Sequence, residues 1–391
     1  MDNRQKKIIE CLRTYPIATM DERRVITDTM LASIAQAGIE GHIGFDFRGK
    51  FETVITFESK KKIQESKTDK LKEILFKKFE RGDILVGVSK DCNYIEESDP
   101  ENPGHRCGHY EDVWNIYVNI PHVNPEILGL REVMTEFEYT HNSHILPLPI
   151  GSHIFGEPLV VDLVRAPHVL VCSAPGMGKT TLLHNLIISL LYSKTPEEVQ
   201  LTLIGPDEFN VYESLRKSYL WQPVITDGDN AISAIETLNT EVDRRYKLLK
   251  QAGVLNISEY IAASSESMPY IVTIIDEYSD LMKTYGEEFE SRIARIAQLG
   301  HAVGIHIIIS TNKITEEVIT PKIKANFPSR IALKVNTSEE SRLILDEPGA
   351  EELEHKGQVL FPYQGCTYDL QNPLVTTAEI RAVVSNLIEI W

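Results

Sequence analysis

The residues of this chain with the most distinct chemistry form a short loop that contains two glycines. The loop follows an apolar run, Val169–Cys172, and precedes a helix-like segment. Its members are Ser173, Ala174, Pro175, Gly176, Met177, Gly178, Lys179, Thr180 and Thr181. Glycine lets a backbone pass close to an anion, and the N–H groups at a helix N-terminus point toward it. This layout predicts a phosphate-binding P-loop, in which Lys179 reaches the β- and γ-phosphates of ATP and the Thr180 hydroxyl holds Mg²⁺.

One position of the loop departs from the P-loop pattern. The pattern G-x-x-x-x-G-K-[ST] begins with glycine, and this chain has Ser173 there. An ordinary strand–turn–helix corner is the alternative interpretation. The strand, the glycines, the Lys-Thr pair and the helix are all in register, however, which favours phosphate binding.

A second group of candidate residues follows another apolar run. Tyr270–Ile275 is followed directly by two acids, Asp276 and Glu277. Such a run is typical of a parallel strand buried on both faces, and ligands bind at the carboxyl ends of such strands. We predict that Asp276 holds the Mg²⁺ shell and that Glu277 acts as the general base on the attacking water. A merely solvated strand end is the alternative.

The elements that position these residues alternate between strands and helices from residue 165 onward. Helical segments such as Ala231–Gln251, which precedes a C-capping Gly253, lie between short apolar runs. The predicted strands are Val169–Cys172, Gln200–Ile204, Ile271–Ile275, Ile305–Ser310, Arg330–Val335 and Gln358–Phe361. This alternation predicts an α/β fold, a RecA-like P-loop ATPase domain with a mostly parallel sheet, over residues 165–391.

Residues 1–130 predict a small α+β domain, joined to the ATPase domain by a connecting segment over 131–164. The small domain is expected to contain helices over Asp21–Gly38 and Lys60–Glu80, strands within Ile43–Phe57, and a strand over Val113–Ile120.

The polar segment Asp91–Glu111 is rich in turn-forming residues and is expected to be a surface insertion. It contains Cys92, His105, Cys107 and His109. Their spacing matches no standard zinc finger, so a plain loop and a structural metal site both stay open.

Composition limits the class of protein. No window approaches the roughly 18 apolar residues of a membrane span, and the N-terminus lacks the apolar core of a secretory signal. Five scattered cysteines give no disulfide framework, so a cytoplasmic location is expected. The net charge of −17 argues against a chain coated in nucleic acid but permits a locally basic channel.

A series of short motifs in fixed order resembles the motor of FtsK/SpoIIIE-type DNA translocases. The similarity extends from about residue 113 to about residue 385. The motifs are Leu130–Val133, Leu146–Leu163, Pro167–Val171, Glu241–Leu249, Ile275–Met282, Ile293–Gln298, Gly304–His306, Ile323–Ala332, Ser341–Asp346 and Gly349–Glu351.

The resemblance implies an ATPase that forms a homo-oligomeric ring, usually a hexamer, and moves double-stranded DNA through it. It implies ATP and Mg²⁺ as cofactors and a sensor residue at Asn312, whose amide would contact the γ-phosphate or the water. The chain contains neither the membrane anchor nor the C-terminal winged helix of the cellular translocases, which favours a soluble motor for DNA transfer, partition or packaging. The identity of the DNA, the direction of movement and the host element stay open.

Several positions depart from the family pattern. The usual Asp-Pro-Lys is replaced by Gly205, Pro206 and Asp207, and the usual Thr-Gln-Arg by Thr311, Asn312 and Lys313. A basic position of the family is His301 here. In the family, that basic residue could be the arginine finger that reaches the ATP of the neighbouring subunit. If so, Arg295, Arg330 and Arg342 are the candidates that could replace it in this chain.

A basic cluster follows the predicted strand Ile305–Ser310, which precedes the expected sensor Asn312, and this cluster is a candidate for DNA contact. Its members are Lys313, Lys322, Lys324 and Arg330. Facing a central channel, they would bind phosphates without reading sequence. The alternative is an ordinary surface neutralised by Glu316 and Glu317.

Two other classes of function stay open. One is a secretion-type ATPase that moves polypeptide, which the acidic charge favours. The other is a ring that binds ATP as a scaffold with weak or no hydrolysis, which Ser173, Asp207 and His301 favour. Stimulation of ATP turnover by duplex DNA separates these classes from a DNA motor.

Overall fold

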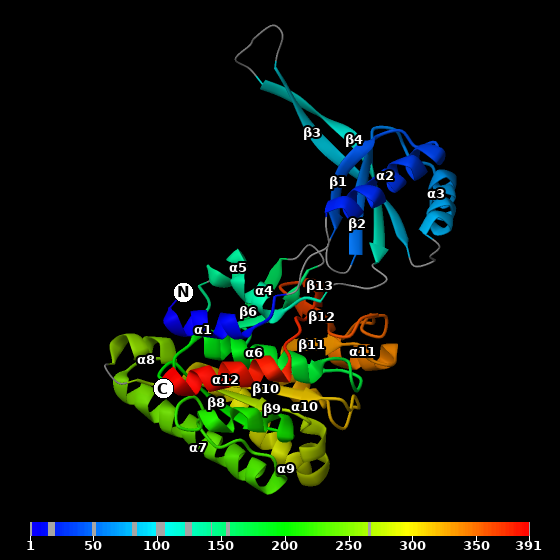
Figure 1. Ribbon diagram of the computed structural model, residues 1–391. Coiled ribbons are helices and arrows are strands. Elements are labelled where there is room, and N and C mark those ends of the chain that lie inside the picture. Colours follow the sequence, from blue (N-terminus) through cyan, green and yellow to red (C-terminus); the bar gives the residue numbers. More distant parts are fainter. Residues whose placement is uncertain are drawn as a thin grey trace. The chain divides into compact units, whose positions relative to one another are not determined.

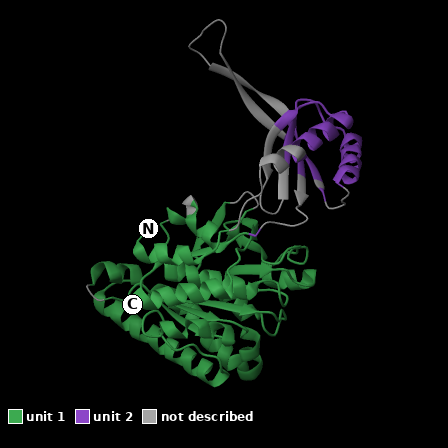
Figure 2. Cartoon of the chain, in the orientation of Figure 1, with its two compact units in different colours: residues 1–14, 128–153, 157–391 green, residues 15–127, 154–156 purple. Residues whose placement is uncertain are grey.

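The structure, a computed structural model, describes residues 2–14, 20–48, 52–79, 84–98, 106–121, 127–141, 143–153, 157–264 and 267–390. Contacts between residues divide the chain into two units, coloured separately in Figure 2. The larger unit comprises residues 1–14, 128–153 and 157–391, and the smaller unit comprises residues 15–127 and 154–156.

A nine-stranded sheet in the order β6-β5-β13-β12-β11-β7-β10-β9-β8 forms the centre of the larger unit. Five neighbouring strands of it are parallel: β7 (His168–Cys172), β8 (Val199–Ile204), β9 (Tyr270–Ile275), β10 (Ile305–Thr311) and β11 (Ser329–Leu333). Strands β7 to β10 are buried along their length apart from one half-buried residue in β8, as expected of strands covered on both faces. The predicted strands are present, and the predicted α/β class is confirmed.

The other half of this sheet is antiparallel. It consists of β12 (Gln358–Tyr363), β13 (Cys366–Gln371), β5 (Pro147–Ser152) and β6 (Pro158–Asp162). Strands β5 and β6 lie in the segment expected to be a connection, and β13 was not expected. Both prolines of β5 weaken a strand prediction, and β13 is largely exposed, so neither gives an apolar run.

Helices pack against this sheet (Figure 1). Helix α6 (Lys179–Ser193) contacts β5, whereas α9 (Tyr278–Leu299) contacts β10 and α7 (Gly228–Ala252). The predicted C-cap Gly253 has a left-handed φ of 73°. The remaining helical elements are α4 (Leu130–Thr135), α5 (Phe137–Thr140), η1 (Asp207–Leu215), α8 (Ile257–Ala263), η2 (Gly300–Val303), α10 (Pro321–Asn326), α11 (Ser338–Leu345) and α12 (Thr377–Ile390). None of the described helices is long and apolar enough to cross a bilayer.

The N-terminal helix α1 (Asn3–Cys11) belongs to the larger unit, although residues 1–130 were expected to form one small domain. The buried Arg4 guanidinium donates hydrogen bonds to the carbonyls of Tyr192 and Lys194, at the end of α6, and to the Tyr219 hydroxyl. A cation at a helix C-terminus satisfies carbonyls that lack helical partners. These long-range contacts leave no local signal in the sequence.

The smaller unit has a four-stranded antiparallel sheet in the order β1-β2-β4-β3, with helices α2 (Met20–Gln36) and α3 (Glu65–Phe79). Its strands are β1 (His42–Arg48), β2 (Glu52–Ser59), β3 (Leu85–Ser98) and β4 (Arg106–Pro121). Buried side chains from both helices and the sheet form its core, among them Met30, Ile55 and Leu71.

The expectation of a loop over Asp91–Glu111 was wrong for most of that segment. Strands β3 and β4 stay paired from Leu85 opposite Asn119 to Ser98 opposite Arg106. Main-chain hydrogen bonds hold such a ribbon, so it needs no apolar pattern. Cys92, Cys107 and His109 lie on these strands, but their side chains, like the whole of His105, lie outside the described residues. The metal site there stays untested, and no cluster of metal-ligating side chains occurs elsewhere among the described residues.

Two histidines are buried between the parallel strands β7 and β10. The Ile307 N–H donates to His168 Nδ1 (3.1 Å), and His306 Nδ1 lies 2.8 Å from the Pro167 carbonyl. Burial lowers the pKa of His168 from 6.5 to about 3 and that of His306 to about 4. Both rings are therefore neutral in the folded protein at neutral pH.

We expect the free energy of unfolding to fall as pH drops from 6.5 toward 4. In that window the unfolded chain takes up protons on these rings and the folded chain does not, so protonation favours unfolding. Urea unfolding of His306→Asn should show a shallower pH dependence than the wild type, by up to about 1.4 kcal/mol per pH unit. An identical pH dependence in both proteins would contradict this assignment.

Candidate active site

The loop over residues 173–178 lies between the end of β7 and the start of α6, as predicted. Its backbone is fixed from three directions. The N–H of Ser173 donates to the Thr311 carbonyl (3.3 Å) and that of Ala174 to the Lys334 carbonyl (2.7 Å). Gly357, which precedes β12, donates its N–H to the Met177 carbonyl (2.9 Å). Sequence patterns did not identify Lys334 and Gly357 as contacts of the loop, because their backbone groups rather than their side chains form these hydrogen bonds.

The two loop glycines have positive φ angles, 79° at Gly176 and 106° at Gly178. A Cβ atom at Gly176 would meet nothing within 4 Å. At Gly178 it would lie 3.2 Å from the Gly357 Cα. Gly178 is therefore required by its conformation and by the close approach of the Gly357 backbone, in addition to any bound anion.

The Lys179 side chain lies at the centre of the candidate site and is 4% exposed. Its ammonium forms ion pairs with Asp276 and, at 3.1 Å, with Glu277 Oε1. It also lies 3.3 Å from the Ser310 hydroxyl. A buried ammonium requires compensating charge, and the two acids at the end of β9 supply it.

Asp276 is almost fully buried and accepts further hydrogen bonds. Donors to its Oδ1 are the Ser310 hydroxyl and the N–H of Glu277, the latter at 2.9 Å. Ser310 reaches Asp276 because Ile309 is paired with Ile275 in the parallel strands β10 and β9. Ser310 was not predicted as a site residue, because it falls within a predicted strand and belongs to no recognisable motif.

Glu277 lies directly before α9 in a left-handed conformation (φ 54°, ψ 44°). Such a conformation is unfavourable for a non-glycine residue and is often found at functional sites. The Asn312 amide donates to Glu277 Oε1 (2.8 Å), and Asn312 Oδ1 accepts from the Ser173 hydroxyl (3.2 Å). The structure thus brings Asn312, Ser173, Lys179 and both acids together.

Thr180 and Thr181 lie in the first turn of α6, both half-buried. In the same helix, His184 Nδ1 lies 2.9 Å from the Tyr212 hydroxyl, and burial lowers the pKa of His184 to about 4.

Pro175 and Gly176 are exposed at the tip of the loop, which leaves this side of the loop accessible to a ligand.

The glycine at position 205 lies against the acids. A Cβ atom there would be 3.0 Å from the Asp276 Cβ and 3.0 Å from the Phe209 ring. The acid usual for the family at this position would not fit without movement of one of these neighbours. Asp207 instead starts η1 and accepts a hydrogen bond from the Asn210 side chain (3.1 Å).

Most of the basic cluster after β10 is paired within the chain. Lys322 bonds to Ser291 (2.7 Å) and lies near Glu290, whereas Lys324 and Arg330 both pair with Asp346 at 2.6 Å. The acids that pair with this cluster are therefore Glu290 and Asp346, rather than Glu316 and Glu317 as in the alternative interpretation. Lys313 is exposed, and its ammonium has no ion-pair partner among the described residues.

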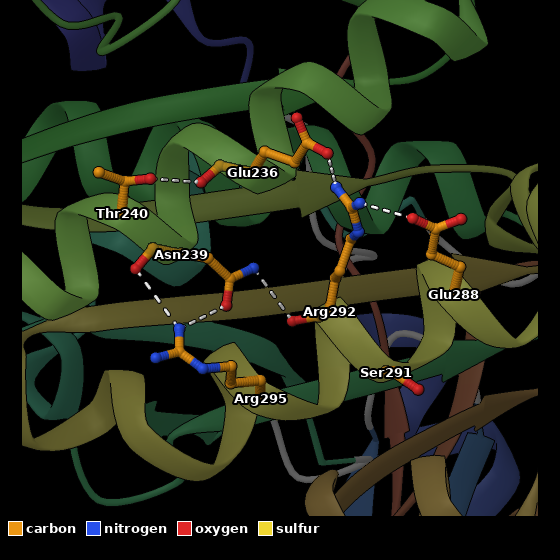
Figure 3. A pocket seen from close by; sticks show the side chains of 7 residues that line it. All are labelled: Glu236, Asn239, Thr240, Glu288, Ser291, Arg292 and Arg295. Carbon is orange, nitrogen blue, oxygen red and sulfur yellow. Dashed lines mark hydrogen bonds and ion pairs between the residues drawn. The ribbon is translucent and has the colours of Figure 1, made fainter.

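The alternative arginines also have partners inside the chain. Arg342 bonds to the Ser338 hydroxyl (2.8 Å), and Arg295 bonds to Asn239 (2.9 Å) and Asp243 (2.7 Å). Figure 3 shows Arg292 and Arg295 of α9 reaching toward α7, with Arg292 between Glu236 and Glu288. These residues line an open surface pocket of about 620 Å³. The remaining residues of this pocket are Thr240 and Ser291. His301 lies in η2 and is exposed.

Comparison with known proteins places residues 129–316 within the model of the FtsK/SpoIIIE family. The chain is 40% identical over 280 residues to a DNA translocase FtsK of Chlorobaculum tepidum, covering 68% of this chain and 35% of the relative. It is 37% identical over 277 residues to a DNA translocase FtsK of Helicobacter pylori, covering 69% and 33%. The chain therefore spans about a third of the length of these curated relatives.

Solved structures with the same fold are more distant in sequence. The pCW3 conjugation coupling protein TcpA, in a monomer form with ATPγS, superposes with a TM-score of 0.55 at 23% identity, covering 88% of this chain and 93% of that one. The cytoplasmic domain of the type VII secretion ATPase EccC of Thermomonospora curvata gives 0.54 at 23% identity, covering 62% and 31%. At this identity the likeness establishes the fold alone.

The two loop glycines allow a matched test of this geometry. Gly176→Ala should lower the free energy of unfolding by about 1–2 kcal/mol through backbone strain alone. Gly178→Ala should cost about 1–3 kcal/mol more, because its Cβ also meets the backbone of Gly357. Urea unfolding of both variants measures the difference, and equal losses would show that Gly357 does not constrain the loop.

Proposed function

The chain belongs to the FtsK/SpoIIIE family of P-loop ATPases through residues 129–316, and on this basis we propose that it hydrolyses ATP to move double-stranded DNA. The observation that carries the proposal is the convergence of Lys179, Asp276, Glu277 and Asn312 at one P-loop. These four groups would supply the phosphate-binding cation, the Mg²⁺ ligand, the general base and the sensor amide that ATP hydrolysis requires.

The residues present fit ATP with Mg²⁺. The loop from Ser173 to Gly178 leads into the N-terminus of α6, where N–H groups without helical partners favour phosphate. The Thr180 hydroxyl and the Asp276 carboxylate are the oxygen donors that would hold Mg²⁺, which neutralises phosphate charge when bound. Lys179 provides the cation for the β- and γ-phosphates.

Glu277 is the proposed general base. Its carboxylate is one-third exposed, so water can reach it, and Asn312 and Lys179 hold its Oε1. When Lys179 turns toward phosphate, the Asn312 amide still fixes this carboxylate near the sensor strand. The carboxylate then accepts the proton of the attacking water.

Double-stranded DNA is the proposed substrate of the motor rather than polypeptide. Relatives of 35–40% identity are DNA translocases, whereas the secretion ATPase EccC shares 23% identity with this chain. The polypeptide alternative is favoured by the net charge of −17, since an acidic protein must present a local basic surface to DNA. Exposed Lys313 follows the sensor Asn312 directly and is the candidate for such a contact.

From the membership of the FtsK/SpoIIIE family, we also propose that the active form is a ring of identical subunits. The three candidates for an arginine finger, Arg295, Arg330 and Arg342, are bonded within their own chain. Each would have to leave its partner to reach another subunit's ATP. The exposed His301 side chain has no hydrogen bond or ion pair among the described residues, but an imidazole lacks the planar, forked guanidinium of arginine.

Substitutions of the two charged groups should separate binding from hydrolysis. Lys179→Ala should weaken ATP binding by about 10- to 150-fold, because charge-assisted hydrogen bonds to phosphate are lost. Glu277→Gln should retain binding and lower kcat by about 10²- to 10⁴-fold. Nucleotide titration and phosphate release measure the two effects. Equal turnover in wild type and Glu277→Gln would refute the catalytic assignment.

Duplex DNA should stimulate ATP turnover, and Lys313 should contribute one phosphate contact. Lys313→Ala should reduce the log–log salt slope of DNA binding by about 0.9, equally for unrelated sequences. Lys324→Ala is the matched control, because its ammonium is already paired with Asp346. Turnover without stimulation by DNA would favour the polypeptide motor, and no turnover would favour a scaffold. The same slope in both variants would remove Lys313 from the DNA interface.

A further inference from the structure

We propose that Ser173 is a positioning residue for hydrolysis, which acts by anchoring the Asn312 amide that holds Glu277. This inference rests on the proposed ATPase function and assigns a role to the one loop position that departs from the P-loop pattern. It concerns kcat rather than nucleotide affinity.

Two consecutive hydrogen bonds connect Ser173 of the loop, through Asn312, to the proposed base Glu277. The Ser173 hydroxyl donates to Asn312 Oδ1 (3.2 Å), and Asn312 Nδ2 donates to Glu277 Oε1 (2.8 Å). Ser173 has no exposed surface, so water does not replace its hydroxyl. A buried hydrogen bond of this kind fixes the rotamer of its partner more firmly than a solvated one.

The chemistry of an amide makes both contacts necessary. Its oxygen accepts and its NH₂ group donates, so Asn312 can support the Glu277 carboxylate only with Nδ2 toward it. The Ser173 hydroxyl satisfies the oxygen at the other end. Without it, the short Asn312 side chain is held by Glu277 alone and moves whenever that carboxylate moves.

These two hydrogen bonds are expected to matter most for the position of Glu277 when nucleotide is bound. In the structure, Glu277 Oε1 also accepts from Lys179 (3.1 Å). Lys179 is the residue proposed to turn toward phosphate, which leaves Asn312 as the side-chain donor to Oε1. Because Ser173 belongs to the P-loop itself, it ties the position of the base to the loop that holds the phosphates.

A purely structural serine would behave differently in a double-mutant cycle. If Ser173 acts through Asn312, its removal should matter only while Asn312 is present. The cycle uses the full chain and the variants Ser173→Ala, Asn312→Ala and the double variant. Ser341→Ala is the control, because Ser341 is an equally buried serine whose hydroxyl donates to the Glu347 carbonyl and accepts from the Ala350 N–H, and which has no hydrogen bond to residues 173–178 among the described residues.

We expect Ser173→Ala to lower kcat by about three- to tenfold, the effect of one lost hydrogen bond, with the Kd for ATP unchanged. In the Asn312→Ala background the same change should have no further effect on kcat. Ser341→Ala should leave kcat unchanged. The same cycle in urea, without nucleotide, should show a favourable coupling between Ser173 and Asn312, which tests the bond independently of turnover.

Multiplicative losses of kcat in the cycle, a loss confined to ATP affinity, or absence of coupling in urea would each overturn the inference. None of these results would count against the ATPase itself. Failure of the proposed function is a separate result, in which the wild-type protein binds ATP but releases no phosphate in the presence of duplex DNA.

Discussion

A buried ammonium group, that of Lys179, determines how the candidate site is arranged. It is nearly inaccessible to water and is compensated by Asp276 and Glu277. Removing one partner of a buried ion pair costs about 3–5 kcal/mol, because the other charge is left uncompensated. The strand order β7-β10-β9 meets this need, since it places the loop, Ser310 and both acids at the carboxyl edge of neighbouring parallel strands.

Under the proposed function, Asp276 and Glu277 compete with the phosphates of ATP for the Lys179 ammonium. An ammonium that reaches the phosphates must give up at least part of its contact with the carboxylates. Asp276 also accepts hydrogen bonds from the Ser310 hydroxyl and from the Glu277 N–H, and Glu277 accepts one from the Asn312 amide, and none of these bonds involves Lys179. Each acid therefore has a hydrogen-bond donor other than Lys179, and under the proposed function a Mg²⁺ ion held by Asp276 would compensate the charge that Lys179 leaves.

The parts of this arrangement that depend on sequence pattern could be predicted, whereas those that depend on long-range backbone contacts could not. Apolar runs identified β7 to β12, and the spacing of glycines, Lys179 and Thr180 identified the loop. Nothing local indicates that Gly357 packs on Gly178, that Lys334 accepts from Ala174, or that α1 is bonded to the end of α6. A strand over Val113–Ile120, within β4, was predicted, but the paired part of the β3–β4 ribbon within residues 91–111 was missed, because its polar residues are held by main-chain pairing rather than by an apolar pattern.

The most direct test of this account is a structure of the protein with a non-hydrolysable ATP analogue and Mg²⁺. Lys179 Nζ should then lie within hydrogen-bond distance of a phosphate oxygen and should no longer be paired with Glu277. The Thr180 hydroxyl should lie at the metal, and the Asn312 amide should still be bonded to Glu277. A bound nucleotide with Lys179 still held by both Asp276 and Glu277 would contradict it.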